Sequence, residues 1–263
     1  MSGPLAEVSA WVAAHPYLAD LARLQEGLDS AGVVPQARRD PRSPEEIARG
    51  IPLLHSESLD PAVFVEAGKL IASMAEALLE AELPAALVQE CRTLCVLLGE
   101  NPEAGTRLAR SVAANDPEAP AGLGTFLAWK ALGRVAGTAD AVRTWTANCC
   151  PTCGALPAMA QLRESDRGRE RALVCGLCGT RWSYARIGCP YCRNDVVERL
   201  GVLEPEDEAS FRIDFCRECN AYLKTYLGDG GDPLALSDWS TLHLDAACAG
   251  RGLHRGGPSL YDL

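Results

Sequence analysis

The chain of 263 residues lacks several features that would assign it to a common functional class. No apolar run approaches the length of a membrane span, which is about 18 residues. The first residues have no basic segment and include Glu7, so we expect no signal peptide. A Gly-rich phosphate loop, a Ser-His-Asp order and paired catalytic carboxylates are also missing. We therefore expect a cytoplasmic protein that is neither membrane-bound nor an enzyme. Its four histidines are scattered and suggest no general base: His15, His55, His243 and His254.

The sequence also lacks an excess of basic residues. The net charge is −10, and it divides into −8 over residues 1–140, +1 over residues 141–226 and −3 over residues 227–263. A protein that binds nucleic acid carries a basic face to meet the phosphates. We therefore expect no nucleic-acid partner.

Cysteine is the residue that the chain has in quantity. Eight of its twelve cysteines form four Cys-x-x-Cys pairs. Two intervening residues let the chain turn so that both sulfurs reach one ion, at about 2.3 Å for zinc. Four such pairs in a reducing compartment indicate metal ligands in preference to a redox dithiol or to disulfides. The predicted ligands are Cys150, Cys153, Cys175, Cys178, Cys189, Cys192, Cys216 and Cys219.

The pairs also form an internal repeat. The leading Cys150 lies 25 residues before Cys175, and Cys189 lies 27 residues before Cys216. This spacing predicts two similar modules in tandem, each with one tetrahedral Cys₄ site built from two successive pairs. An interleaved pairing of the four pairs remains an alternative. Sites of four sulfurs suit iron or zinc, so we expect two metal ions of one kind or the other.

The periodicity of apolar residues changes along the chain. Residues 1–140 show helical spacing, with a capping box at Ser43 and Glu46 and a helix start at Asp60 and Pro61. After Trp145, short strand-like runs alternate with the Cys pairs; they are residues 158–162, 172–174, 181–187, 196–203 and 211–215. We therefore predict the α+β class: a helical domain over residues 1–144 and two tandem rubredoxin-like or zinc-ribbon modules over 145–187 and 188–263.

The neighbours of the Cys pairs suggest how each turn is built. Gly154, Gly179 and Asn220 each follow a pair and readily adopt the positive φ that such a turn requires, whereas Arg193 fits this rule poorly. The arginines near the pairs are open to two interpretations, donors to the sulfurs or solvated surface residues; they are Arg181, Arg186, Arg193 and Arg217. The remaining cysteines are interpreted as packed residues that bind no metal: Cys91, Cys95, Cys149 and Cys248.

Five segments together resemble the FdhE family of formate dehydrogenase accessory proteins. They are CPTCG (150–154), CGLCGTRWSYARIGCPYC (175–192), FCRECNAYLKTY (215–226), LHLD (242–245) and GLHRGGPSL (252–260). The resemblance implies a cytoplasmic assembly factor, or chaperone, that binds the catalytic subunit of a formate dehydrogenase during maturation. It implies iron as a candidate metal. It also makes Arg181, Arg186, Arg217 and Lys224 candidates for contact with the metal site or with the partner.

Two other functions fit parts of the pattern. Iron in a Cys₄ site changes its charge state, so a rubredoxin-like electron-transfer protein is the alternative hypothesis. Many zinc ribbons bind RNA or DNA, but the near-neutral charge of the Cys-rich segment argues against that function.

Overall fold

The structure is a computed structural model that describes residues 4–32, 40–136, 145–166, 168–206, 208–230 and 234–261. Its contacts divide the chain into two units, Met1–Arg38 with Glu57–Gly137 and Arg39–Ser56 with Thr138–Leu263. We call them the helical unit and the ribbon unit. The predicted boundary at residue 144 lies outside the described residues. The three predicted domain ranges therefore stay a prediction.

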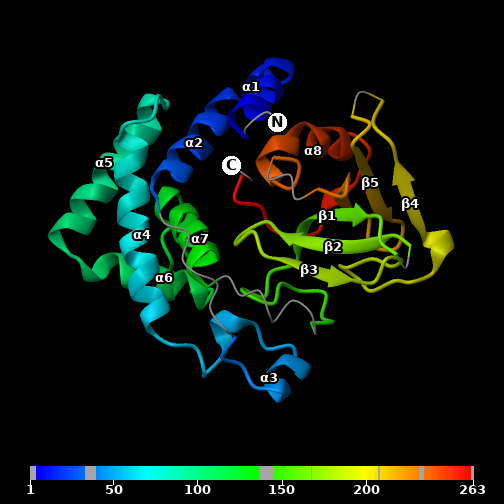
Figure 1. The fold of residues 1–263 in the computed structure, drawn as a ribbon, viewed down its shortest axis with the longest axis horizontal. Helices are drawn as coiled ribbons and strands as arrows, with labels where there is room; N and C mark the ends of the chain where they lie inside the picture. Colours follow the sequence, from blue (N-terminus) through cyan, green and yellow to red (C-terminus); the bar gives the residue numbers. More distant parts are fainter. Residues whose placement is uncertain are drawn as a thin grey trace. The chain divides into compact units, whose positions relative to one another are not determined.

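Amphipathic helices make up the helical unit (Figure 1, blue to green). Pro61, Pro84 and Pro102 directly precede three of these helices, where the fixed φ of proline suits the first turn. The Asp60 carboxylate also accepts the backbone N–H of Ala62 at 2.9 Å, close to the start that the sequence predicts. The helices are α1 (Pro4–Ala14), α2 (Ala19–Ser30), α4 (Ala62–Leu79), α5 (Ala85–Glu100), α6 (Glu103–Ala113) and α7 (Leu123–Val135).

Helix α4 is the centre of this unit and packs against α2, α5, α6 and α7. The stripe that the sequence predicts on it is largely buried, with Ile71, Met74 and Leu78 all 0% exposed. Helices α4 and α6 approach closely at Gly68, where a Cβ atom would lie 2.6 Å from the backbone nitrogen of Thr106. A larger side chain at Gly68 would therefore push the two helices apart.

The segment 39–56 belongs to the ribbon unit, although its sequence looks like part of the helical domain. It contains α3 (Pro44–Ala48), which begins with the predicted capping box of Ser43 and Glu46, and η2 (Leu53–His55). The segment belongs to the ribbon unit because backbone hydrogen bonds attach it to the turn of Cys150 and Cys153. The N–H groups of Leu53 and Leu54 donate to the carbonyls of Pro151 and Thr152 at 2.8 and 2.9 Å.

One sheet spans both predicted metal modules, and its strand order is β3-β2-β1-β6-β5-β4. Each module is an antiparallel meander of three strands, and the parallel pair β1–β6 joins the two modules head to tail. The strands are β1 (Pro157–Arg163), β2 (Glu170–Cys175), β3 (Arg181–Tyr184), β4 (Leu200–Leu203), β5 (Phe211–Cys216) and β6 (Ala221–Leu227); a short β7 (His254–Arg255) extends the sheet beside β6.

The chain after β6 returns to the sheet (Figure 1, orange to red). It forms η5 (Asp238–Thr241), α8 (Leu242–Ala249) and β7. Strand β6 is buried over most of its length, and alternate residues point to opposite faces. Lys224 therefore faces η5 and α8, which it contacts, and Leu223 faces the other way.

The architecture confirms the predicted α+β class with two ribbon modules. Some elements differ from the sequence-based expectation. The predicted strand 196–203 begins with a 3-10 turn, η4 (Val197–Arg199), and β6 was not predicted because Lys224 interrupts its apolar pattern. Within the described ranges, no helix has both the length and the hydropathy that crossing a bilayer requires.

Candidate metal centres

The first Cys₄ cluster consists of Cys150, Cys153, Cys175 and Cys178, all buried. The Sγ atoms of Cys150 and Cys178 are 3.5 Å apart, and those of Cys153 and Cys175 are 3.4 Å apart. Two successive pairs therefore meet, as the repeat predicts for sequential pairing. The turn before β1 supplies one pair, and the turn between β2 and β3 supplies the other.

The second cluster consists of Cys189, Cys192, Cys216 and Cys219. Both of its cross-pair distances, Cys189 to Cys219 and Cys192 to Cys216, are 3.7 Å between Sγ atoms. Its burial differs from that of the first cluster, because Cys192 is exposed and Cys219 is half-buried. Solvent therefore reaches the second cluster more easily than the first.

Each Cys pair sits in a turn whose backbone bonds repeat. In every turn the N–H that follows the second Cys donates to the carbonyl of the first Cys; the four donors are Gly154, Gly179, Arg193 and Asn220, at 2.9, 3.2, 3.0 and 2.8 Å. All four donors have positive φ, at 82°, 72°, 62° and 56°. Glycine and asparagine adopt this conformation at small cost, as the sequence predicts for three of the turns.

Arg193 adopts the same conformation although it was expected to fit the rule poorly. The turn imposes this backbone because both cysteines must face one point, and that requirement outweighs the local preference of arginine. Its side chain is held by a hydrogen bond from Nη2 to Oδ1 of Asn148 at 3.1 Å. Asn148 in turn donates to the carbonyl of Pro190 at 2.7 Å. This bond links the turn that begins at Cys150 to the turn that begins at Cys189.

Both clusters fit a tetrahedral ion. Four sulfurs at about 2.3 Å from an ion lie about 3.8 Å from one another. The four Sγ–Sγ distances given above, 3.4 to 3.7 Å, approach this value. A disulfide needs sulfurs at about 2.05 Å, so none of these pairs is bridged. The donor set is all sulfur, which suits iron or zinc.

The surroundings shift the pKa values of individual cluster cysteines in both directions. Hydrogen bonds from Cys150 and the other cluster thiols, together with burial, raise the pKa of Cys153. Burial raises the pKa of Cys189 in the same way. Burial alone would also raise the pKa of Cys216. Hydrogen bonds from the backbone N–H groups of Cys219 and Glu218 outweigh burial, so the pKa of Cys216 is lowered. An ion that binds must therefore displace protons, which makes metal affinity pH-dependent.

Polar side chains next to the sulfurs were missed by the sequence reasoning. The Thr180 hydroxyl lies 3.2 Å from Sγ of Cys178 and donates to the Thr152 hydroxyl at 2.9 Å. At the second cluster, Nδ2 of Asn194 donates to Sγ of Cys216 at 3.7 Å. Thr180 and Asn194 each lie two residues after a Cys pair, which is the signal that could have found them.

Arg42 is a further residue that the sequence reasoning missed. Its side chain is 0% exposed and pairs with Asp40 at 2.7 Å. The second amino group, Nη1, donates to the carbonyls of Ile51 and Pro151 at 2.7 and 2.9 Å, and the guanidinium stacks over the Trp145 ring at 5.2 Å. Arg42 therefore fixes the turn that carries Cys150 and Cys153.

The three predicted arginines lie in different surroundings. Arg181 and Arg186 are exposed. Nη1 of Arg217 donates to the carbonyls of Glu198 and Leu200, both at 3.1 Å, and its guanidinium stacks over the Phe215 ring. Arg217 therefore braces the start of β4.

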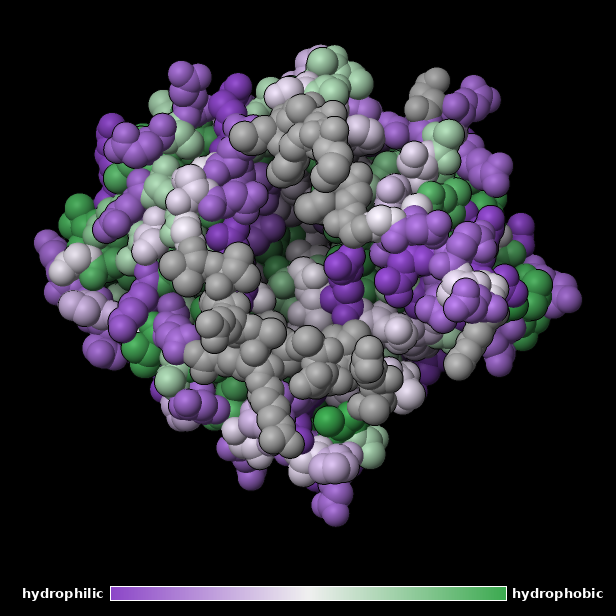
Figure 2. All heavy atoms as spheres, viewed as in Figure 1, coloured by the Kyte–Doolittle hydropathy of each residue, from purple (hydrophilic) through white to green (hydrophobic). Residues whose placement is uncertain are grey.

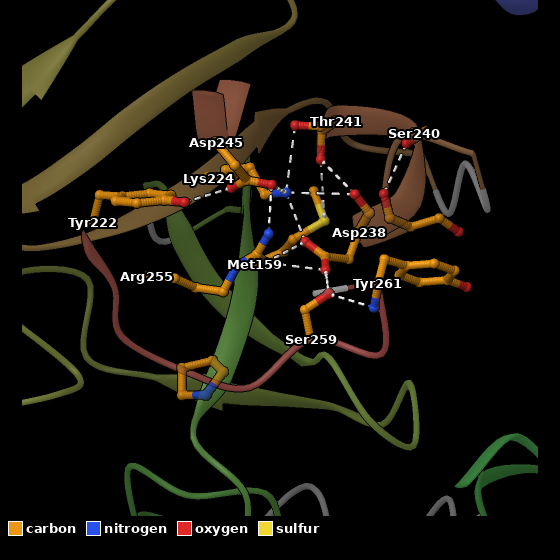
Figure 3. Close-up of polar contacts among 12 residues, drawn as sticks. Met159, Tyr222, Lys224, Asp238, Ser240, Thr241, Asp245, Arg255, Ser259 and Tyr261 are labelled. Atoms are coloured by element: carbon orange, nitrogen blue, oxygen red, sulfur yellow. Dashed lines mark hydrogen bonds and ion pairs between the residues drawn. The ribbon is translucent and has the colours of Figure 1, made fainter. Parts of the chain in front are cut away.

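Lys224, the fourth predicted residue, lies in a buried ion network (Figure 3). Its side chain is 0% exposed, and Nζ lies 2.6 Å from Oδ1 of Asp238 and 2.8 Å from Oδ2 of Asp245. Arg255 pairs with the same two carboxylates, and Tyr222 donates to Asp245 at 2.7 Å. Strand β6, η5, α8 and β7 each contribute one charge, so the network ties the end of the chain to the sheet.

The remaining cysteines lie outside both clusters. Cys91 and Cys248 are 0% and 1% exposed, and burial raises the pKa of each to about 11. Burial also raises the pKa of Cys95 and of Cys149. Cys91 and Cys248 are therefore packed in the interior, and the interpretation of all four as residues that bind no metal stays a prediction.

Comparisons with known proteins give a consistent result. The family model described as "FdhE, central domain" matches residues 149–186. A "Protein FdhE homolog" from Stutzerimonas stutzeri is 38% identical over 115 residues, which cover 42% of this chain and 37% of that protein. Another from Shewanella baltica is 28% identical over 172 residues, which cover 61% of this chain and 56% of that protein. The matches thus span about half or less of the length of these relatives.

The crystal structure of the FdhE protein from Pseudomonas aeruginosa has a similar fold, with a TM-score of 0.62 and 24% identity. The match covers 93% of this chain and 87% of that one.

The fold and the clusters define a protein with a helical unit and two tandem Cys₄ ribbons on a shared sheet. In its Cys-rich segment the chain is similar to FdhE proteins, and its fold is similar to that of a solved FdhE structure.

Proposed function

We propose that the chain is a metal-binding assembly factor, a chaperone that binds the catalytic subunit of a formate dehydrogenase while that subunit matures. The similarity to FdhE proteins supports this role, and so does the resemblance of the Cys-pair segments to formate dehydrogenase accessory proteins. We also place the protein in the cytoplasm, where reducing conditions keep its unbridged thiols available for metal. The role requires binding surfaces and no catalytic group.

One observation carries the proposal: two thiol clusters of tetrahedral spacing are built into one sheet. We propose that each cluster holds one ion, iron or zinc, through its four cysteines. When bound, the ion would cross-link two turns, and structural zinc contributes about 10–16 kcal/mol in small metal domains. A sheet stiffened at two points would offer a partner a preformed surface, which lowers the entropic cost of binding.

The four other predicted residues take different roles in this proposal. Arg186 and Arg181 are exposed and available to contact the partner. Arg217 supports β4, next to the second cluster. The buried ammonium of Lys224 lies out of reach of a partner, so we assign it the task of holding η5 and α8 on the sheet.

Co-purification tests the proposed function. The tagged chain is expressed with the catalytic subunit of a formate dehydrogenase, and both are recovered under conditions that preserve metal. We expect the subunit to follow the tag with the wild-type chain and to be lost with Cys216→Ser, which removes one ligand. Cys91→Ser, a buried cysteine outside the clusters, is the matched control. Absence of the subunit from the wild-type preparation would contradict the proposal.

Electron transfer is a second candidate because Cys192 is exposed. An exposed ligand sulfur would bring a redox partner close to the second ion. A visible colour that a mild reductant bleaches reversibly would favour this function. Colourless protein that holds two zinc ions per chain would rule it out.

A further inference from the structure

The ribbon unit contains a cavity of about 300 Å³ beside the second Cys₄ cluster. Its lining comes from β2, β4, β5 and β6 and from the segment 186–191, and it includes Cys189 and Cys216. Ligand pockets in proteins measure about 300–1,000 Å³, so this cavity lies at the small end of that range.

Strand register places the cavity on the sheet face opposite the ion network. Val202 is paired with Asp214, and Asp214 is paired with Leu223, so these three side chains share one face. Lys224 is the next residue after Leu223 and therefore points to the opposite face. The cavity and the network are separate features of the sheet.

Arg171 is the most deeply buried charge of the cavity. The residue is 5% exposed, and Nη2 donates to the carbonyl of Gly188 at 2.8 Å. Its guanidinium stacks over the Tyr184 ring at 5.4 Å. Nε is buried and has no hydrogen-bond partner among the described residues. A buried charged donor without a partner is rare in proteins and calls for an explanation.

Arg212 and Arg186 add two more guanidinium groups. Nη2 of Arg212 pairs with Oδ1 of Asp214 at 2.9 Å, while its Nε is buried without a partner among the described residues. Arg186 is exposed at the cavity. Asp214 is the acidic residue of the described lining. Its carboxylate also accepts a hydrogen bond from the Thr225 hydroxyl at 2.6 Å, so it already has two partners, Arg212 and Thr225.

The N–H donors around the cavity, and not its net charge, are what suits an anion. Thiolates at Cys189 and Cys216 would offset part of the arginine charge. The unpartnered Nε atoms of Arg171 and Arg212 nevertheless donate to neither sulfur. Directional N–H donors of this kind suit a carboxylate, which accepts two parallel hydrogen bonds from one guanidinium.

Exposed aliphatic side chains lie around the same cavity. Ile187, Val197 and Val202 are 49%, 60% and 47% exposed, and all three belong to the lining. Figure 2 shows hydrophobic spheres at the right-hand edge of the view, where Figure 1 draws β4. A small anion would fill the cavity and leave these side chains in water, whereas an extended peptide would cover them.

We propose that this arginine-lined cavity binds an extended peptide segment in which an Asp or Glu side chain lies between apolar residues. The carboxylate would accept hydrogen bonds from Arg171, Arg186 and Arg212, and the flanking side chains would pack on Ile187, Val197 and Val202. The inference rests on the proposed function, since the segment would belong to the protein that this chain assists.

Selection from a random peptide library tests the proposal without assuming the partner. The metal-loaded full chain is used as bait, with variants at exposed or half-exposed positions of the cavity: Arg186→Glu, Val202→Asp and Arg212→Gln. Arg251→Glu and Val96→Asp are matched controls, because both residues are exposed and lie outside the lining. The same variants are tested for co-purification with the intact catalytic subunit.

We expect the selected peptides to share an acidic residue between apolar ones. Replacing that acid by its amide should weaken binding at least about tenfold, as should Arg212→Gln, because each removes a charge-assisted pair. The control variants should bind as the wild type does.

Three results would overturn the proposal: selection of no peptide, selection of peptides without an acid, or equal binding by cavity and control variants. Binding of inorganic phosphate or acetate without peptide would likewise reject it and indicate a small anion. If cavity variants still co-purify with the catalytic subunit while losing no peptide affinity, the cavity proposal fails and the assembly function stands. If the wild type selects acidic peptides but never recovers the subunit, the proposed partner is wrong and the cavity proposal stands.

Discussion

Replacing Lys224 by methionine should destabilise the ribbon unit strongly. Lys224 is 0% exposed, and its ammonium lies between Asp238 and Asp245 at 2.6 and 2.8 Å. Methionine has a similar length and no charge, so Lys224→Met keeps most of the packing and removes only the ammonium. The change therefore isolates the electrostatic contribution of one buried group.

The magnitude follows from the charge count of the network. Lys224 and Arg255 balance Asp238 and Asp245, so the wild-type network is neutral. The variant leaves two buried carboxylates facing one guanidinium. Removing one member of a buried pair costs about 3–5 kcal/mol. At about 2–4 °C per kcal/mol for a chain of this size, the melting temperature should fall by about 6–20 °C.

The pKa of Asp238 predicts how the stability deficit of the Lys224→Met variant changes with pH. Burial alone would raise the pKa of Asp238, but Lys224 and Arg255 outweigh it and hold this pKa below its ordinary value of 3.8. A carboxyl with a lowered pKa stabilises the folded state above the pKa of the unfolded chain, and the effect is lost as the pH falls through the folded pKa. Without Lys224 the pKa of Asp238 rises, so the deficit of the variant should shrink between about pH 7 and about pH 4.

Urea unfolding at several pH values is the assay, and the variant is compared with the wild type at each pH and at equal metal content. Arg251→Gln, at an exposed arginine after α8, is the control and should leave stability within about 0.5 kcal/mol of the wild type. The double variant Lys224→Met with Asp245→Asn restores charge balance and should recover part of the loss. A Lys224→Met variant as stable as the control at pH 7, or a deficit that grows on acidification, would refute the reasoning.

Three further predictions concern the clusters. Cys150→Ser should lower the metal content by about one ion per chain, whereas Cys248→Ser, also buried but outside the clusters, should keep both ions; elemental analysis decides, and equal contents would contradict the ligand assignment. Arg193→Gly should stabilise the protein by about 1 kcal/mol and Gly179→Ala should destabilise it by a similar amount, because both positions have positive φ; urea unfolding that shifts both variants in one direction would contradict this explanation. Acidification from about pH 8 to about pH 5 should release metal, first from the cluster that contains Cys192, because protons compete for thiolates; a metal-binding dye that detects no pH dependence would count against it.

The grouping of the cysteines could be predicted from sequence because it depends on local spacing. Each turn is a short segment, and the separation of its pairs places Cys150 with Cys175 and Cys189 with Cys216. The expected positive φ after a pair follows from the same local geometry. Arg193 shows the limit of this reasoning, since the requirement that two sulfurs face one ion overrides the preference of the residue.

The features that were not predicted all depend on contacts between distant segments. Arg42 reaches the turn of Cys150 from more than a hundred residues earlier in the chain. Lys224 looks like a surface residue in sequence, and only the return of η5 and α8 to the sheet buries it. The cavity beside Arg171 likewise requires β2 and the segment 186–191 to meet, which no local pattern encodes.

The parallel pair β1–β6 makes the two ribbons depend on each other. Met159 on β1 is paired with Lys224 on β6, and the Thr241 hydroxyl donates to the Met159 sulfur at 3.9 Å. Strand β6 begins directly after the turn of Cys216 and Cys219, so loss of the second ion would loosen the strand that carries Lys224. The ion network and the seam with β1 would weaken with it. The second cluster therefore supports the strand on which the ion network depends, whereas the first cluster supports the turns at the ends of β1 and β2 and the 39–56 segment bound to them.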